Sequence, residues 1–129
     1  MIRAAPARRW SAAFALGVAG CAADAVVPGA TTTATGFAIA PYEVHEECAR
    51  VVPGDRLDYR FEAKSPVSFQ IYYQEGVMFI APVSRDDVTE FGGVFQVPDA
   101  RRYCLRWEAG REGALLDYRI RLLRASTAP

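Results

Sequence analysis

The sequence contains one histidine, His45, which precedes two glutamates and a cysteine in the segment YEVHEEC. A histidine together with carboxylates could ligate a metal ion such as zinc. Adjacent residues on a strand point to opposite faces, however, so His45, Glu46 and Glu47 cannot all converge on one ion. We therefore expect no metal site, and we interpret this triplet as the solvated, charged end of a strand.

Catalysis has few candidate residues in this chain. His45 would have to serve a serine, or a cysteine would have to remain reduced, and no motif supports either arrangement. Asp86 and Asp87 could act as acid and base on a sugar, but the segment SRDDVTE reads as a polar turn. We predict a protein that is not an enzyme and has no cofactor. The alternative is a periplasmic hydrolase that uses these carboxylates on cell-wall sugar or ester bonds.

The first cysteine, Cys21, follows a charged start and a short apolar segment, WSAAFALGV. This segment is shorter than the roughly twenty residues that span a bilayer, and it is typical of an export signal. The four residues VAGC at 18–21 resemble a bacterial lipobox, in which the signal is cleaved before a cysteine that receives lipid. We predict a signal peptide over 1–20 and acylation of Cys21. The alternative is cleavage after Ala25, which would release a soluble protein.

The other two cysteines, Cys48 and Cys104, form an even pair under either cleavage. Disulfides form and persist in the oxidising compartments to which exported proteins go. We predict a Cys48–Cys104 bond, and the alternative is two free buried thiols. Because Cys104 alternates with Tyr103 and Leu105, we expect the bond to lie outside the central core.

The charge of the exported part of the chain bears on its partners. The whole chain of 129 residues has a formal net charge of zero, but three of its fifteen basic residues precede the apolar segment. The remainder therefore carries a net charge of about −3. A mildly acidic domain is a poor match for the phosphates of nucleic acid, so we expect no nucleic-acid partner.

Residues 37–124 show the alternation of apolar and polar side chains that is typical of strands with one buried face. In RLDYRFEA, for example, Leu57, Tyr59 and Phe61 fall on one side. A second run, PVSFQIYYQ, follows a boundary at KSP, and we expect further strands at 77–80, 88–97, 101–109 and 115–123. The glycines at 92 and 93 indicate a bulge or a close backbone approach. Several short strands at this spacing predict one all-β domain, an antiparallel β-sandwich.

The flanking segments have no such pattern. Residues 22–36, AADAVVPGATTTATG, consist of small residues, threonines, one proline and two glycines, with no period that could bury a face, which predicts a flexible linker after the lipidated Cys21. Such a coil would span roughly 20 Å on average and about 50 Å at full extension. We expect residues 125–129 to form a disordered tail.

The last two strands are predicted to form a hairpin with GREG as its loop. Pairing Trp107 with Leu116 keeps the apolar residues on one face and places Arg106 opposite Asp117. A slip of two residues would oppose like charges, which is unfavourable. This register gathers four arginines on the outer face, where guanidinium groups could bind a phosphate or carboxylate: Arg102, Arg106, Arg119 and Arg121. The other interpretation of this face is an ordinary solvated surface.

The order EEC…VVPGDRLDYRFEA…PVSFQIYYQEG…FGGVFQVPDARRYCLRWEA…LLDYRIRLL, residues 46–123, resembles the GOLD domain, the β-sandwich of Golgi cargo receptors and some lipid-binding proteins. Cys48 and Cys104 occupy places comparable to the cysteines that pair in that family. The coiled coil and membrane helix of cargo receptors are missing here. The resemblance implies a GOLD-like sandwich and leaves the ligand open.

Together these observations predict an envelope lipoprotein, held in the lipid bilayer by Cys21, whose sandwich is a non-catalytic binding or structural module. Its partner would be a protein or an anionic envelope ligand. Ala22 follows Cys21, and an aspartate there favours inner-membrane retention in well-studied Gram-negative bacteria. We therefore expect the outer membrane, facing the periplasm.

Overall fold

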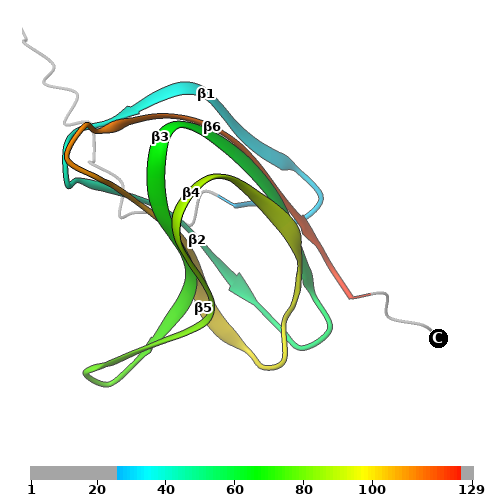
Figure 1. The fold of residues 1–129 in the computed structure, drawn as a ribbon. Helices are drawn as coiled ribbons and strands as arrows, with labels where there is room; N and C mark the ends of the chain where they lie inside the picture. Colours follow the sequence, from blue (N-terminus) through cyan, green and yellow to red (C-terminus); the bar gives the residue numbers. More distant parts are fainter. Residues whose placement is uncertain (1–25, 126–129) are drawn as a thin grey trace, which may run out of the picture.

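The computed structural model describes residues 26–125, and these form a six-stranded antiparallel β-sandwich (Figure 1). No helix within this part of the chain is long and apolar enough to cross a membrane. The strands are β1 (Thr31–Ile39), β2 (Val44–Val51), β3 (Arg56–Glu75), β4 (Met78–Gln96), β5 (Arg101–Ala109) and β6 (Ala114–Leu123).

The long strand β3 belongs to both layers of the sandwich. Its first half, Arg56–Lys64, pairs with β6, and β6 pairs in turn with β1. Its second half pairs with β5 from Val67 to Tyr72, and β5 pairs with β2. Strand β4 follows β3 along both halves. One hydrogen-bonded sheet is thus curled over on itself so that its two halves face each other.

The curl of β3 coincides with the segment KSP, where two separate strands were predicted. The pairing of β3 with β4 shifts register between Glu62 and Val67. Ser65 lies within this irregularity in the left-handed region, with φ of 78°, and Pro66 has no N–H to donate to a neighbour. The two predicted strands are therefore one bent strand, and the predicted strands at 77–80 and 88–97 are likewise joined in β4.

The core lies between the two layers and is built from the alternating apolar residues of β3, β5 and β6. Phe61 of one layer contacts Trp107 of the other at 5.9 Å between ring centroids, and Trp107 stacks on Tyr118 at 4.8 Å. The predicted core faces of these strands are buried, except that Ala63 and Tyr73 of β3 are only partly buried. Gly92 also behaves as predicted, since a Cβ there would lie 2.9 Å from the backbone oxygen of Tyr59.

Two predicted features are wrong. Strands β5 and β6 do not form a hairpin ladder, because each pairs with its own half of β3. The predicted linker also extends too far toward the C-terminus, because β1 begins at Thr31 rather than after Gly36. Val26 is already buried at 4% exposure, and Pro28 bridges to Leu122. The folded domain therefore starts at about Val26.

The predicted disulfide is confirmed. Cys48 of β2 lies directly opposite Cys104 of β5, with an S–S distance of 2.08 Å. Both cysteines lie outside the cluster of core residues, as alternation predicted. Since β2 pairs only with β5, the bond fastens an edge strand to the rest of the sheet.

Candidate functional site

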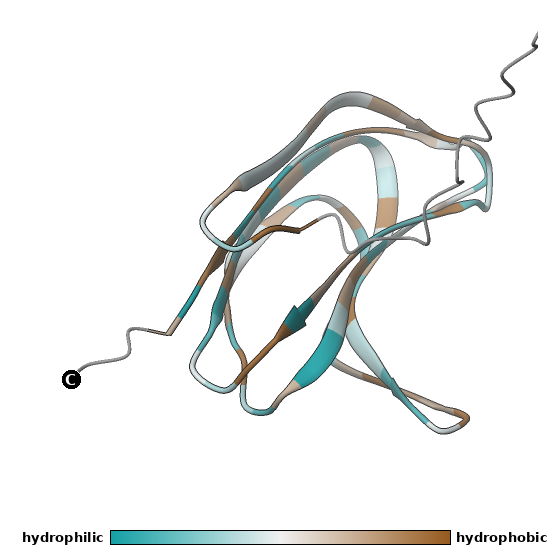
Figure 2. Cartoon of the chain, turned by 180° about the vertical axis from the view of Figure 1, so that it is seen from behind, coloured by the Kyte–Doolittle hydropathy of each residue, from teal (hydrophilic) through white to brown (hydrophobic). Residues whose placement is uncertain are grey.

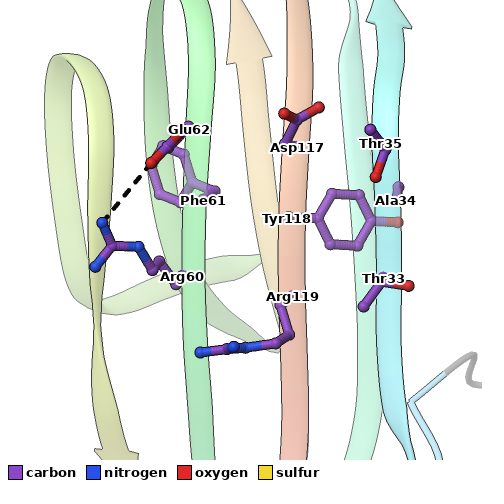
Figure 3. Close-up of a pocket in the computed structure, with 9 residues that line it drawn as sticks. All are labelled: Thr33, Ala34, Thr35, Arg60, Phe61, Glu62, Asp117, Tyr118 and Arg119. Atoms are coloured by element: carbon purple, nitrogen blue, oxygen red, sulfur yellow. Dashed lines mark ion pairs between the residues drawn. The ribbon is translucent and has the colours of Figure 1, made fainter.

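A shallow groove of about 230 Å³ crosses the layer formed by β1, β6 and the first half of β3 (Figure 3). Its exposed polar side chains come from all three strands. Thr33 and Thr35 lie on β1, Asp117 and Arg119 on β6, and Arg60 and Glu62 on β3; Ala34, Phe61 and Tyr118 complete the lining.

Two arginines oppose each other in this groove. Arg60 of β3 and Arg119 of β6 are direct cross-strand partners, and both are exposed. Arg60 forms an ion pair with Glu62 at 3.7 Å, between side chains that are 63% and 62% exposed. Arg119 forms no ion pair with any of residues 26–125, and Figure 3 shows its guanidinium extending from β6 over β3. Like charges in opposed positions repel, and the ion pair with Glu62 neutralises Arg60 but not Arg119.

The neighbouring acidic group is engaged elsewhere. The backbone N–H of Gly36 donates a hydrogen bond of 2.6 Å to Oδ1 of Asp117. This contact depends on an irregularity in the β1–β6 pairing between Ala34 and Phe37, where Gly36 has a φ of 61°. Thr33 lies opposite Arg119 on the other side and offers a hydroxyl that can donate or accept. Two guanidiniums and a hydroxyl are groups that bind a phosphate or a carboxylate.

The structure divides the predicted arginine face. Arg119 and Arg121 are on β6, whereas Arg102 and Arg106 are on β5 and belong to the other layer. Arg106 pairs with Glu108 at 3.1 Å and with Glu46 at 3.6 Å. Arg121 lies opposite Asp58 and Thr31. The predicted gathering of all four arginines therefore does not occur.

Arg60 was missed by the sequence analysis. It is one of the alternating polar residues of RLDYRFEA, and nothing in the sequence distinguishes it from the other outward residues. Only the pairing of β3 with β6 brings it beside Arg119. A search for arginines at alternating positions in every predicted strand would have included it, without showing which partner it has.

The segment with the histidine does not form a solvated strand end. His45 and Glu47 point inward, with side chains that are 18% and 11% exposed. Nε2 of His45 lies 3.0 Å from the hydroxyl of Tyr118, which donates to Glu47 at 2.7 Å. Burial, followed by this hydrogen bond and the charge of Glu47, raises the pKa of Tyr118. Trp107 stacks beside the histidine, and its buried Nε1 has no hydrogen-bond partner among the described residues.

His45, Glu46 and Glu47 do not converge on one point, as three ligands of a metal ion would. Glu46 points to the opposite face from His45 and Glu47, where its carboxylate accepts a 2.6 Å hydrogen bond from Tyr72. Glu46 lies near Sγ of Cys48 and Cys104. Because those two sulfur atoms are joined in a disulfide, they offer no thiolate to a metal ion.

Asp86 and Asp87 are both exposed on β4. They fall where the pairing with β3 is irregular, between Arg85 and Val88, and Asp87 has a φ of 52°. The irregular backbone agrees with the turn-like composition of this segment, although β4 continues through it. Cys21, the predicted lipidation site, lies outside the described residues, as do the signal peptide and the end of the predicted tail.

No protein-family model matches this chain, and no curated protein does. The chain is similar in structure to the pre-peptidase C-terminal domain of collagenase from Bacillus anthracis. That match has a TM-score of 0.52 and 9% identity over 74% of this chain and 89% of the other. A second match is PliG of Aeromonas hydrophila, a periplasmic inhibitor of g-type lysozyme, with a TM-score of 0.49 and 13% identity over 72% and 82% of the two chains. The first likeness supports the β-sandwich fold and nothing further.

Proposed function

We propose that this protein is an envelope lipoprotein whose β-sandwich is a non-catalytic module that binds an anionic group of another envelope component. The opposed pair of Arg60 and Arg119 carries this proposal. An anion seated between the two guanidiniums would remove their repulsion and accept charge-assisted hydrogen bonds from both. The Thr33 hydroxyl at the β1 side of the groove would add a further donor.

The proposed ligand is a phosphate or carboxylate on a larger molecule, because the groove is shallow and open. Envelope components carry such groups on lipid headgroups and on cell-wall peptides.

Lipid on Cys21 would hold this module at the membrane. The support is the VAGC segment after a charged start and a short apolar run. Val26 is buried, so only five residue steps separate the anchor from the fold, at most about 18 Å. The domain would thus sit close to the bilayer, and Ala22 after the cysteine favours the outer membrane.

The absence of turnover is part of the proposal. The buried disulfide removes both cysteines as nucleophiles, and His45 hydrogen-bonds to Glu47 and Tyr118 rather than to a serine. Asp86 and Asp87, the carboxylates of the hydrolase alternative, are exposed neighbours on β4. We expect the purified protein to leave peptidoglycan and simple ester and glycoside substrates intact, and loss of a measured turnover in Asp86→Asn or Asp87→Asn would establish the alternative.

The binding proposal is tested by following the arginine Nε–H signals by NMR while inorganic phosphate or succinate is added at constant ionic strength. The signals of Arg60 and Arg119 should shift with phosphate, with succinate or with both, depending on whether the site binds phosphate, carboxylate or either group. Arg119→Ser should abolish the shift, whereas Arg111→Ser, which removes the same charge from the loop between β5 and β6, should not. Equal shifts in both variants would overturn the site. Acylation is tested separately by fatty-acid labelling, which Cys21→Ala should abolish.

A further inference from the structure

The hairpin that joins β3 to β4 extends beyond the body of the sandwich. Pairing of β3 with β5 ends at Tyr72 and Cys104, so residues 73–80 pair only with one another. We call this segment the finger. It projects away from both layers in Figure 1, and its tip is coloured as hydrophobic in Figure 2.

Three consecutive large apolar side chains form the tip of the finger. Val77 is 92% exposed, Met78 is 63% exposed and Phe79 is 67% exposed. Met78 and Phe79 are neighbours on a strand, so they point to opposite faces. The tip is therefore apolar on both faces. A docking surface for one protein would need only one apolar face, whereas a lipid bilayer surrounds whatever enters it.

The base of the finger is polar and braced. Arg101 of β5 forms an ion pair with Glu75 at 3.6 Å, and its guanidinium lies 4.1 Å from the centre of the Tyr73 ring. Tyr73 packs edge-on against the buried Tyr103. These contacts hold the finger away from the body, and they place charged groups behind the apolar tip, where lipid headgroups would lie.

From these observations, and from the lipid anchor of the proposed function on which this step rests, we infer that the tip Val77–Met78–Phe79 inserts into the bilayer surface. The occupant is lipid rather than protein because the chain leading to the fold is short. Cys21 is five residue steps from the buried Val26, so Val26 of the acylated protein lies within about 18 Å of the membrane. Insertion at interfacial depth suits an apolar tip with a polar base.

The inference is tested with a tryptophan at the tip of the mature lipidated protein, from which the signal peptide with Trp10 has been cleaved. Val77→Trp is reconstituted in phosphatidylethanolamine and phosphatidylglycerol vesicles that contain brominated acyl chains. Its emission should be shifted to shorter wavelength and quenched by bromine. The matched control is Val94→Trp, an exposed valine on β4 at 56% exposure, whose emission should be unaffected. The native Trp107 is buried at 1% exposure and provides a constant background.

A second variant separates insertion from a general effect of proximity. Adding Met78→Ser and Phe79→Ser to Val77→Trp should weaken the contact of the tip with lipid, by roughly tenfold for each apolar side chain removed, and lower the quenching to that of the control. Equal emission of Val77→Trp and Val94→Trp would overturn the inference. So would a blue shift that appears without lipid and grows with protein concentration, because a second copy would then cover the tip.

Failure of the anchor and failure of the finger are distinguishable. If Cys21 incorporates fatty acid and Val77→Trp is not quenched, the finger inference fails and the anchor stands. If Cys21 incorporates none, the anchor proposal fails, and quenching of Val77→Trp by added vesicles still decides the finger.

Discussion

Arg60 and Arg119 face each other across β3 and β6 as direct partners, on the outer face of the sandwich. Two positions further along the same strand pair, Asp58 lies opposite Arg121. One strand pair thus contains an unfavourable like-charge pair next to a favourable opposite-charge pair; Asp58 is partly buried, and the three arginines are exposed. Substitutions in this strand pair can therefore measure both the stability that the arginine pair costs and the anion binding that it would provide.

Replacing Arg119 with glutamate should increase stability and abolish anion binding. The change converts a like-charge pair into an opposite-charge pair, which contributes roughly 0.2–1 kcal/mol. Urea unfolding measures the first effect and phosphate titration the second. Arg121→Glu is the matched control, and it should lower stability by a similar amount because it opposes Glu to Asp58. A loss of stability in Arg119→Glu would show that the arginine makes a structural contact.

Removing the disulfide by Cys48→Ala together with Cys104→Ala should lower the free energy of unfolding by roughly 2–4 kcal/mol. The bond closes a separation of 56 residues and fastens the edge strand β2. Hydrogen exchange should increase most in β2, since β2 pairs only with β5. Equally rapid exchange in β6 of the variant would indicate that the bond stabilises the whole fold rather than this edge.

Acid should destabilise the protein through Asp55. Complete burial raises the pKa of this carboxyl, but hydrogen bonds from the backbone of Val52 and Ala125 and the ion pair with Arg124 outweigh burial, so that the net pKa is lowered. The stabilisation is therefore present above the unfolded pKa of about 3.9 and is lost as the pH falls through the folded value.

Asp55→Asn should lower stability at neutral pH by roughly 1–3 kcal/mol, because charge-assisted hydrogen bonds to a buried group are lost. It should also flatten the dependence of stability on pH below about 4. Urea unfolding at several pH values measures both. Asp99→Asn is a useful comparison, because the pKa of Asp99 is also lowered, by hydrogen bonds from Arg101 and Tyr103. An unchanged slope in Asp55→Asn would contradict the assignment.

Two adjacent glutamates should affect two different tyrosines. Burial, then the hydrogen bond and charge of Glu46, raises the pKa of Tyr72 to about 12, and Glu47 acts in the same way on Tyr118. Glu46→Gln should lower the pKa of Tyr72 only, and Glu47→Gln that of Tyr118 only. Absorbance of tyrosinate during alkaline titration measures this. A shift of the same tyrosine in both variants would mean that the two glutamates do not face opposite sides of β2.

The alternation of residues in the sequence was sufficient to predict the apolar core face of β5. Tyr103, Leu105 and Trp107 of β5 are all buried as expected, because the two faces of a strand follow from its geometry alone. The disulfide followed from the cysteine count and the export signal. These are local or compositional properties, and no knowledge of neighbouring strands is needed to state them.

The pairing of strands could not be predicted in this way. The expected register of the last two strands relied on avoiding opposed like charges, yet the structure opposes Arg60 to Arg119 and Arg50 to Arg102. Such pairs contribute at most about 1 kcal/mol, which is far less than the burial of the core. The charge rule was therefore too weak to choose between one hairpin and two separate ladders.

What the sequence determined by itself is the class of fold, the buried faces of its strands and the cysteine pair, since each depends on alternation or composition. The tertiary structure decided the rest. Only the bend of β3 at Ser65 separates β5 from β6 and brings Arg60 beside Arg119. The same long strand leaves Val77 exposed at a tip that no other strand reaches. The arginine pair arises from a contact between distant segments, whose energy depends on packing across the whole sheet rather than on any local pattern.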